Sequence, residues 1–291
     1  MSTPSRTPEQ EPSPDRAEYN AFFPSPYSLS QFTASRTGAQ PVVYDNANPG
    51  GRWKVLMVGT DERYMTMANG RKFSTGNHPV ETLLPLYHLD QAGFQVDVAT
   101  ISGQSVKLEM WAMPSEDELV TGTHQKYLAK LDNPLKLSDV VQTALGPNSP
   151  YLAVFLPGGH GAMLGLPQSP ELGQVLRWAV QHDKLVIALC HGPASLLAAQ
   201  VGAEGQAFAF EGYEICAFPD GMDKQTPAIG YVPGPMPWYM GERLKALGVK
   251  ILNTDITGRC HQDGLLVTGD SPLASDALGR LAVQALRQRA A

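Results

Sequence analysis

Five apolar runs of strand length punctuate the chain, and none keeps the strict alternation of apolar and polar residues that marks a half-exposed strand. They span residues 53–59, 94–99, 151–156, 184–189 and 249–252. Strands that are apolar on both faces are typical of a parallel sheet covered on both sides. The runs therefore predict the strands of a buried central sheet.

The segments between these runs show the spacing of helices, with apolar residues three and four positions apart. Examples are Val80, Leu83, Leu84 and Tyr87, and later Leu172, Val175, Leu176 and Ala179. Strands that alternate with helices predict βαβ units and a mostly parallel, doubly wound sheet. We therefore expect an α/β fold over residues 53–291, a flavodoxin-like three-layer sandwich.

Three regions depart from this alternation. Residues 104–150 hold two charged, helix-prone pieces, 115–131 and 134–145, which predict an inserted helical subdomain beside the carboxyl ends of the strands. Residues 1–19 are rich in Pro, Ser, Glu and Arg, which predicts a disordered tail. Residues 20–52 combine prolines with aromatic residues, which predicts an arm laid over the body or over a partner subunit.

Composition and charge narrow the classes of function. The 291 residues are 43% hydrophobic, enough for a large core, and carry a net charge of −6. The 22 Lys and Arg residues are scattered, which argues against nucleic acid as a stoichiometric partner. No apolar stretch approaches the roughly 18 residues of a membrane span, and no secretory signal begins the chain. We expect a soluble, cytoplasmic protein without a membrane partner.

The sharpest chemical signal is Cys190, which directly follows a predicted buried strand and precedes Gly192-Pro193 at the start of an apolar-periodic helix. This is the arrangement of a nucleophile elbow, with Cys in the place of Ser. A helix N-terminus favours the thiolate, so we expect a lowered thiol pKa. The alternative is a small buried apolar residue, which is the prediction for Cys216; Cys260 is expected in a loop. Three isolated cysteines do not form a disulfide framework.

Two more segments have the composition of a site. Gly158-Gly159 follows another buried strand, and paired glycines let backbone amides approach a ligand as an oxyanion hole requires, although many such turns only reverse the chain. Glu81 falls in the first turns of a helix that Asn77 or Thr75 could cap. Glu81 alone is therefore compatible with helix stabilisation or with catalysis.

Several motifs in one order carry a resemblance to a known family. The segments are FSTGNHPVETLLPLYHL, FLPGGHGA and ALCHGPA, followed by ICAFPDGMDKQTPAIGY, ITGR and LLVTGDSP. Together they resemble the ThiJ/PfpI superfamily and, within it, the HchA-type heat-shock chaperones that are also described as glyoxalase III and protein deglycase. The likeness includes NAFFPSPYSLSQF and runs from about Asn20 to the C-terminal helix.

The resemblance implies a role for each matching residue. Cys190 would be the nucleophile, His191 its base, and Asp223 the carboxylate that orients His191. Glu81 would lie against the thiol, and the amides of Gly159 and His191 would form the oxyanion hole. Such a set supplies nucleophile, base and orienting group, and a carboxyl beside sulfur can hold or relay a proton. The resemblance implies a homodimer and no cofactor.

The metal site of the HchA-type proteins does not carry over. The resemblance places a histidine and a glutamate just after the LYHL helix and a histidine in the insert. Asp90, Gln95 and Tyr127 occupy these positions here, with His124 three residues before the last. A set without its first imidazole and its carboxylate predicts no bound metal.

Three functions follow from these observations. The leading hypothesis is an enzyme that acts without glutathione on reactive dicarbonyls such as methylglyoxal, or on their early adducts with proteins. The second is a holding chaperone for unfolded proteins, using the apolar residues Phe22, Phe23, Trp111, Met113 and Trp238. The third is an amidotransferase or peptidase that pairs Cys190 with His261-Gln262-Asp263. The sequence leaves open whether free dicarbonyls or glycated macromolecules are the main substrate.

Overall fold

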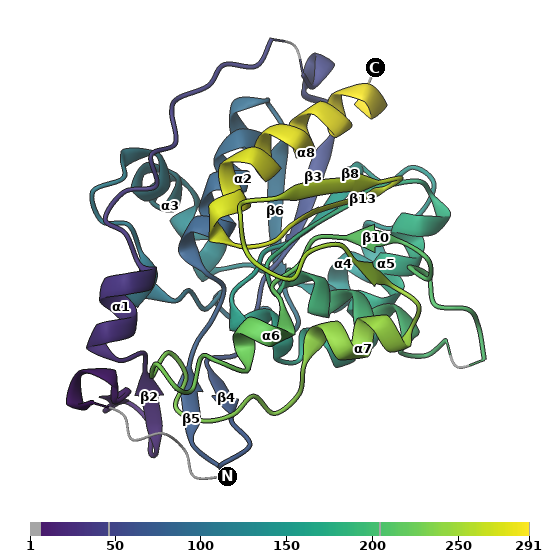
Figure 1. The fold of residues 1–291 in the computed structure, drawn as a ribbon. Coiled ribbons are helices and arrows are strands. Elements are labelled where there is room, and N and C mark those ends of the chain that lie inside the picture. Colours follow the sequence, from purple (N-terminus) through teal and green to yellow (C-terminus); the bar gives the residue numbers. More distant parts are fainter. Residues whose placement is uncertain (1–6, 46, 204, 291) are drawn as a thin grey trace.

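A seven-stranded sheet forms the centre of the computed structural model, which describes residues 7–45, 47–203 and 205–290 (Figure 1). Neighbouring strands are parallel, except that the edge strand β12 is antiparallel to β13. The inner strands follow the order 2-1-3-4-5 of a flavodoxin-like sheet. In spatial order the strands are β12 (Cys260–Asp263), β13 (Leu266–Gly269), β9 (Leu185–Leu189), β8 (Tyr151–Leu156), β3 (Lys54–Val58), β6 (Gln95–Thr100) and β7 (Leu135–Lys136).

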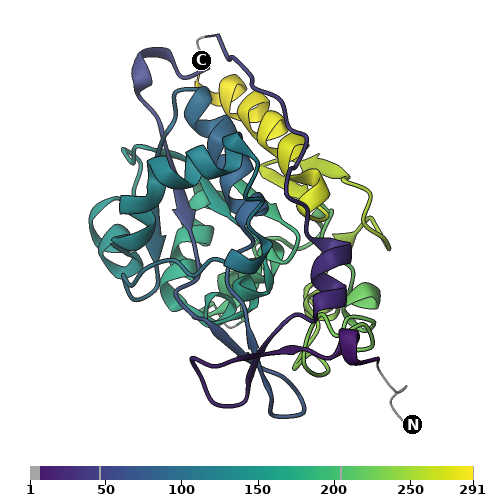
Figure 2. The same cartoon turned by 90° about the vertical axis from the view of Figure 1, so that its left-hand side faces the viewer.

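Helices cover both faces of this sheet, which explains why the strands are apolar on both faces (Figures 1 and 2). Val55 and Met57 of β3 pack on one side, whereas Leu56 and Val58 pack on the other, and all four are fully buried. One layer contains α2 (Pro79–Gln91), α3 (Glu118–Asp132) and α8 (Ser275–Ala290). The other contains α4 (Leu137–Thr143), α5 (Pro170–Gln181), the 3₁₀ helix η6 (Gly192–Gln200) and α7 (Met240–Ala246).

The predicted α/β fold class is confirmed, and four of the five predicted strands form as β3, β6, β8 and β9. The fifth predicted strand forms, but it does not belong to the central sheet. Its residues form β11 (Lys250–Ile251), which pairs with β10 (Glu214–Ile215) in a separate two-stranded sheet. The place beside β9 in the seven-stranded sheet belongs instead to β13, a short strand that follows the turn at Gly264 and pairs in parallel with β9.

A second, four-stranded sheet holds part of the N-terminal segment. Its order is β1 (Ser13–Asp15), β2 (Ala21–Phe23), β5 (Lys72–Ser74) and β4 (Tyr64–Thr66). The prediction of disorder is therefore wrong for residues 7–19, while residues 1–6 lie outside the described residues. Pro14 is tolerated because β1 is an edge strand, and the buried Asp15 carboxylate accepts a hydrogen bond from the Tyr64 hydroxyl at 3.3 Å.

The arm of residues 20–52 lies over the body of its own chain (Figure 2). Ser25 caps α1 (Pro26–Phe32), and the Ser28 hydroxyl donates to the Ile229 carbonyl oxygen at 2.7 Å. Further along, the Tyr44 hydroxyl lies 2.7 Å from Nδ1 of the buried His88. The homodimer implied by the resemblance stays a prediction.

The insert contains the two predicted helices, α3 and α4, but it also contains the two-residue strand β7, which pairs with β6. Both residues of β7 are exposed, so an apolar pattern could not reveal it. The insert is thus joined to the sheet at its edge. Among the described helices, none is both long and apolar enough to cross a bilayer. The remaining elements are η1 (Pro8–Gln10), η2 (Pro49–Gly51), η3 (Met110–Ala112), η4 (His160–Met163), η5 (Leu166–Gln168), α6 (Asp220–Asp223) and η7 (Pro272–Ala274).

Candidate active site

The candidate site lies at the carboxyl ends of the parallel strands, the usual ligand-binding edge of such a sheet. Cys190 directly follows β9, and His160 follows β8 after two glycines. Glu81 comes from α2, which begins after the small-sheet strand β5. The topology therefore brings residues about 110 positions apart in the chain to one edge, as expected for consecutive βα units.

Cys190 occupies a strained turn between β9 and η6. Its φ is +58°, in the left-handed region that residues other than glycine rarely adopt. Its N–H donates to the Gly269 carbonyl oxygen at 2.9 Å, and its own carbonyl oxygen accepts from the Phe218 N–H at 3.0 Å. These two bonds hold the backbone in the geometry of a nucleophile elbow.

His191 and Asp223 extend from the thiol in a line. The Cys190 Sγ lies 3.4 Å from His191 Nδ1, and His191 Nε2 lies 2.9 Å from Asp223 Oδ2. The His191 ring is stacked on Phe218, with the ring centroids 4.7 Å apart. Because the carboxylate accepts from Nε2–H, Nδ1 presents its lone pair to the sulfur. His191 is therefore placed to take the thiol proton.

Glu81 is fully buried and makes no hydrogen bond of ordinary geometry to any described residue, although its carboxyl group faces the Cys190 thiol and the Gly159 amide. Gly158 permits this approach. A Cβ at that position would collide with Glu81 Oε2 and would lie 2.8 Å from the Cys190 Cβ. The residue at the N-cap of α2 is His78, not Asn77 or Thr75, and its side chain forms no capping bond.

The pKa of the Cys190 thiol, which lies beside Glu81, differs from the expectation based on the sequence. Burial, followed by the charge of Glu81, raises the pKa of the Cys190 thiol well above its usual range, so the expected lowered pKa is wrong. Burial also raises the pKa of Glu81. The His191 amide lowers the thiol pKa by less than burial raises it. The surroundings of Cys190 thus favour the neutral thiol over the thiolate.

The two amides predicted for the oxyanion hole both face this pair. The Gly159 N–H points to the Glu81 carboxyl and lowers its pKa. The His191 N–H points to the Cys190 sulfur and lowers the pKa of the thiol. Both donors therefore lie beside the thiol and the carboxyl group of this pair. Their role as an oxyanion hole stays a prediction.

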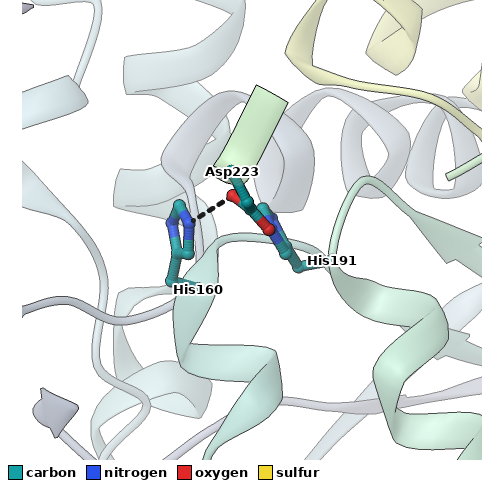
Figure 3. Close-up of side chains that lie close together, drawn as sticks. All are labelled: His160, His191 and Asp223. Atoms are coloured by element: carbon teal, nitrogen blue, oxygen red, sulfur yellow. Dashed lines mark hydrogen bonds and ion pairs between the residues drawn. The ribbon is translucent and has the colours of Figure 1, made fainter. Parts of the chain in front are cut away.

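Two further ionisable side chains belong to the site and were not predicted. The Nε2 of His160 lies 3.2 Å from Asp223 Oδ1 (Figure 3). Glu109 accepts a hydrogen bond from the Thr75 hydroxyl at 2.6 Å, and burial raises its pKa to about 7. The position of His160 after a buried strand and two glycines was a usable signal for the first. For Glu109, inside the insert, the sequence carries no such signal.

The other cysteines and the alternative histidine lie elsewhere. Cys216 is fully buried, as predicted, whereas Cys260 begins strand β12 and is not in a loop. His261 also lies on β12, opposite Thr268. The imidazole that reaches the Cys190 thiol belongs to His191, which favours the Cys-His-Asp set over pairing with His261.

The positions of the family's metal site line a cleft of about 290 Å³, where Asp90, Gln95 and Tyr127 lie with Lys126 and Lys130. Asp90 is already engaged. It accepts from the Tyr127 hydroxyl at 3.0 Å and from the Lys126 ammonium at 2.6 Å. A lysine thus supplies the positive charge beside this carboxylate, and His124 is not among the lining residues.

One group in the described chain has the donors that a divalent metal accepts. The ligand atoms of His160, His191 and Asp223 lie within 4.8 Å of one another. Both Asp223 oxygens, however, already accept hydrogen bonds from the two imidazoles. We therefore interpret this group as a hydrogen-bonded relay, and the absence of a metal stays a prediction.

The structure is a doubly wound sheet in which a cysteine elbow faces a glutamate carried by a helix. The chain belongs to the DJ-1/PfpI family, whose family model matches residues 73–216. It is 57% identical to the protein/nucleic acid deglycase HchA of Pseudomonas aeruginosa (strain UCBPP-PA14) and 53% identical to that of Staphylococcus aureus (strain Newman), in each case over 94% of both chains. Its fold also resembles that of glyoxalase III from Candida albicans, with a TM-score of 0.63, 21% identity, and coverage of 81% of this chain and 98% of that one. The resemblance seen in the sequence is confirmed.

Proposed function

We propose that this protein is a cofactor-independent cysteine enzyme that acts on reactive dicarbonyls and on their early adducts with amines and thiols. The deglycase names of its relatives support the substrate class. The observation that carries the proposal is the buried group in which Cys190 lies beside both His191 and Glu81. It offers a nucleophile, a base and a second proton carrier at one point.

The first step forms a carbon–sulfur bond. The Cys190 sulfur adds to the aldehyde carbon of methylglyoxal while the thiol proton passes to His191 Nδ1. The former carbonyl oxygen then takes up this proton, which gives a hemithioacetal. The amides of Gly159 and His191 stabilise the charge that develops on that oxygen. Because the thiol pKa is raised, attack and proton transfer are coupled.

The second step moves hydrogen between adjacent carbons. Glu81 as carboxylate removes the proton of the sulfur-bound carbon and returns it to the neighbouring carbon through an enediol, while the hydroxyl proton on the sulfur-bound carbon's oxygen passes to the neighbouring oxygen. The product is a lactate thioester of Cys190. Water hydrolyses this ester and restores the thiol, so one methylglyoxal and one water give one lactic acid. The oxidation of one carbon is balanced by the reduction of its neighbour, and no external oxidant is consumed.

Adducts enter the same sequence, with the amine or thiol of the adduct leaving with a proton when sulfur takes its place. Cys190 is only 4% exposed, so the substrate must be slender where it meets the sulfur. A free dicarbonyl meets this condition, and so does an adduct at the end of a long side chain. We propose both as substrates.

The test is lactate formation from methylglyoxal by the purified protein without glutathione. Wild type and Cys260→Ser, a control cysteine outside the site, should form lactate at similar rates. Cys190→Ser should lose about 10³-fold or more, since it lacks the nucleophile. Wild-type protein that forms no lactate, and releases no amine from a methylglyoxal-treated lysine peptide, would overturn the proposal.

A holding chaperone is the second candidate function. The residues named from the sequence, Phe22, Phe23, Trp111, Met113 and Trp238, are half-buried. Exposed large apolar side chains do occur in the arm, at Phe32 and Val43, and in the insert, at Met110 and Leu135. If these bind unfolded chains, Cys190→Ser should suppress aggregation of a heat-denatured reporter as well as wild type does, and Phe32→Ser with Val43→Ser should weaken it.

A further inference from the structure

Asp223 serves two imidazoles, of which the mechanism so far uses one. Its Oδ2 accepts from His191 at 2.9 Å, and its Oδ1 accepts from His160 at 3.2 Å. Figure 3 shows the carboxylate between the two rings. All three side chains are at least 95% buried. The carboxylate thus has a second donor that does not contact the thiol in the described hydrogen bonds.

The His160 ring is fixed by its surroundings. Its centroid lies 4.1 Å from that of His191, 5.6 Å from that of Phe73 and 6.0 Å from that of Tyr231. Its backbone N–H points to the carboxylate of Glu109. His78, whose buried Nδ1 has no hydrogen-bond partner among the described residues, is near enough to interact electrostatically with His160. A ring enclosed on these sides has little freedom to turn away from Asp223.

The second donor matters because Asp223 is charged in a buried place. Burial alone would raise the pKa of this carboxyl, yet its interactions with His191 and His160 hold the pKa well below its usual range. During the proposed reaction His191 gains and loses a proton, so its own interaction with Asp223 changes at every step. The contact with His160 does not take part in that exchange.

We propose that His160 is a positioning residue for the proposed reaction, holding the Asp223 carboxylate ionised and aimed at His191 while His191 carries the thiol proton. The proposal rests on the proposed function and adds a residue to it. Without His160, Oδ1 would be a buried acceptor with no donor, and the carboxylate could rotate or take up a proton. His191 would then lose the orientation of its Nδ1 toward sulfur.

Two substitutions separate hydrogen bonding from packing. His160→Phe keeps a ring among Phe73 and Tyr231 but removes the donor, whereas His160→Gln keeps an N–H donor on a side chain of similar reach. We expect His160→Phe to lower kcat for methylglyoxal by about 10- to 100-fold with KM changed less than about threefold. His160→Gln should recover most of this activity, and His182→Phe, remote from Asp223, should match wild type.

A second readout does not depend on turnover. The rate at which iodoacetamide alkylates Cys190, followed by peptide mapping from pH 6 to 9, should fall at least about fivefold near pH 7 in His160→Phe and be restored in His160→Gln. This result without methylglyoxal turnover by wild type would support the role of His160 while the proposed function fails. Wild-type kcat and alkylation in a folded His160→Phe would overturn the inference. If His160→Phe does not fold, His160→Asn, whose amide is too short to reach Asp223, takes its place.

Discussion

Two buried carboxyl groups flank the Cys190–His191 pair, and their environments drive them in opposite directions. Asp223 and Glu81 are both fully buried, yet Asp223 accepts from two imidazoles and its pKa is lowered, whereas Glu81 faces a thiol and its pKa is raised. Burial alone therefore does not decide the charge state. Burial raises the pKa of Glu81, whereas in Asp223 the interactions with the two imidazoles outweigh burial. In the proposed reaction the charged Asp223 orients His191, and Glu81 is suited to carry a proton.

The Asp223 side of this comparison is tested by Asp223→Asn, for which we expect the largest effect. The amide presents donors as well as an acceptor to two imidazoles, so the His191 tautomer that leaves Nδ1 free is no longer favoured. The kcat for methylglyoxal should fall by about 10⁴. Asp220→Asn, on the same short helix α6, should keep normal turnover, since Asp220 caps α7 and does not contact the site. Normal turnover by Asp223→Asn would refute the orienting role.

The Glu81 side is tested by Glu81→Gln. If Glu81 moves the carbon-bound proton, the amide cannot replace it, and turnover should fall by about 10² to 10⁴ with the fold preserved. If it only supports the start of α2, activity should survive and stability should fall by at most about 1 kcal/mol. Measuring the melting temperature and lactate formation together distinguishes the two. Near-normal turnover at an unchanged melting temperature would end the catalytic assignment.

Glu109 is a third buried carboxyl, intermediate between the other two, and it makes stability depend on pH. Burial raises its pKa from 4.5 to about 7 in the folded protein, so the folded state binds more protons than the unfolded state between these values. Stability is therefore lost as the pH rises from about 4.5 to about 7, with little further change above. Between pH 5 and 8 the free energy of unfolding of wild type should fall by about 2 to 3 kcal/mol more than that of Glu109→Gln. Parallel urea-unfolding curves for the two proteins would contradict this.

The interaction of Glu81 with the thiol predicts a smaller effect: the Glu81→Gln substitution should increase the rate of Cys190 alkylation although it decreases turnover. Removing the charge of Glu81 should lower the pKa of Cys190, so Glu81→Gln should react with iodoacetamide about 5- to 10-fold faster at pH 8 to 9. Labelling of Cys216, measured in the same digest, should stay constant. Slower alkylation of Cys190 in Glu81→Gln would show that the carboxyl activates the thiol at rest.

The smallest expected effect concerns metal. Asp90 is bound by the Lys126 ammonium and the Tyr127 hydroxyl, so the cleft between α2 and α3 needs no divalent cation for its charge. Exhaustive EDTA treatment should leave dicarbonyl turnover and the melting temperature unchanged. Stoichiometric zinc after purification without added metal would contradict the prediction.

Patterns along the chain were sufficient for the elements whose environment is written into consecutive residues. β3, β6, β8 and β9 could be predicted because central parallel strands are buried on both faces. β13 was missed because its run is short and follows a turn, and β1 because proline on an edge strand looks like disorder. Whether β13 or β1 forms depends on the neighbouring strand with which it pairs.

The site residues likewise divide into those that the local sequence indicates and those that only the fold brings together. The elbow at Cys190 is local, and family motifs led to His191, Asp223 and Glu81. His160 and Glu109 join them only through the folding of the sheet and the insert. The raised pKa of Cys190 could not be predicted from the helix N-terminus, because its main causes are burial and the charge of Glu81, a residue 109 positions away in the chain.

The small N-terminal sheet also constrains the order of assembly during synthesis. β1 and β2 form a local hairpin, but β2 finds its partner β5 only when residue 72 has been made, some fifty residues later. β5 leads directly into Thr75 and the helix that holds Glu81. The hairpin of β1 and β2 therefore closes against β5, beside the segment that holds Thr75 and Glu81, by a non-local pairing, a slow kind of step in folding. Completion of that segment is in this way tied to residues 13–23.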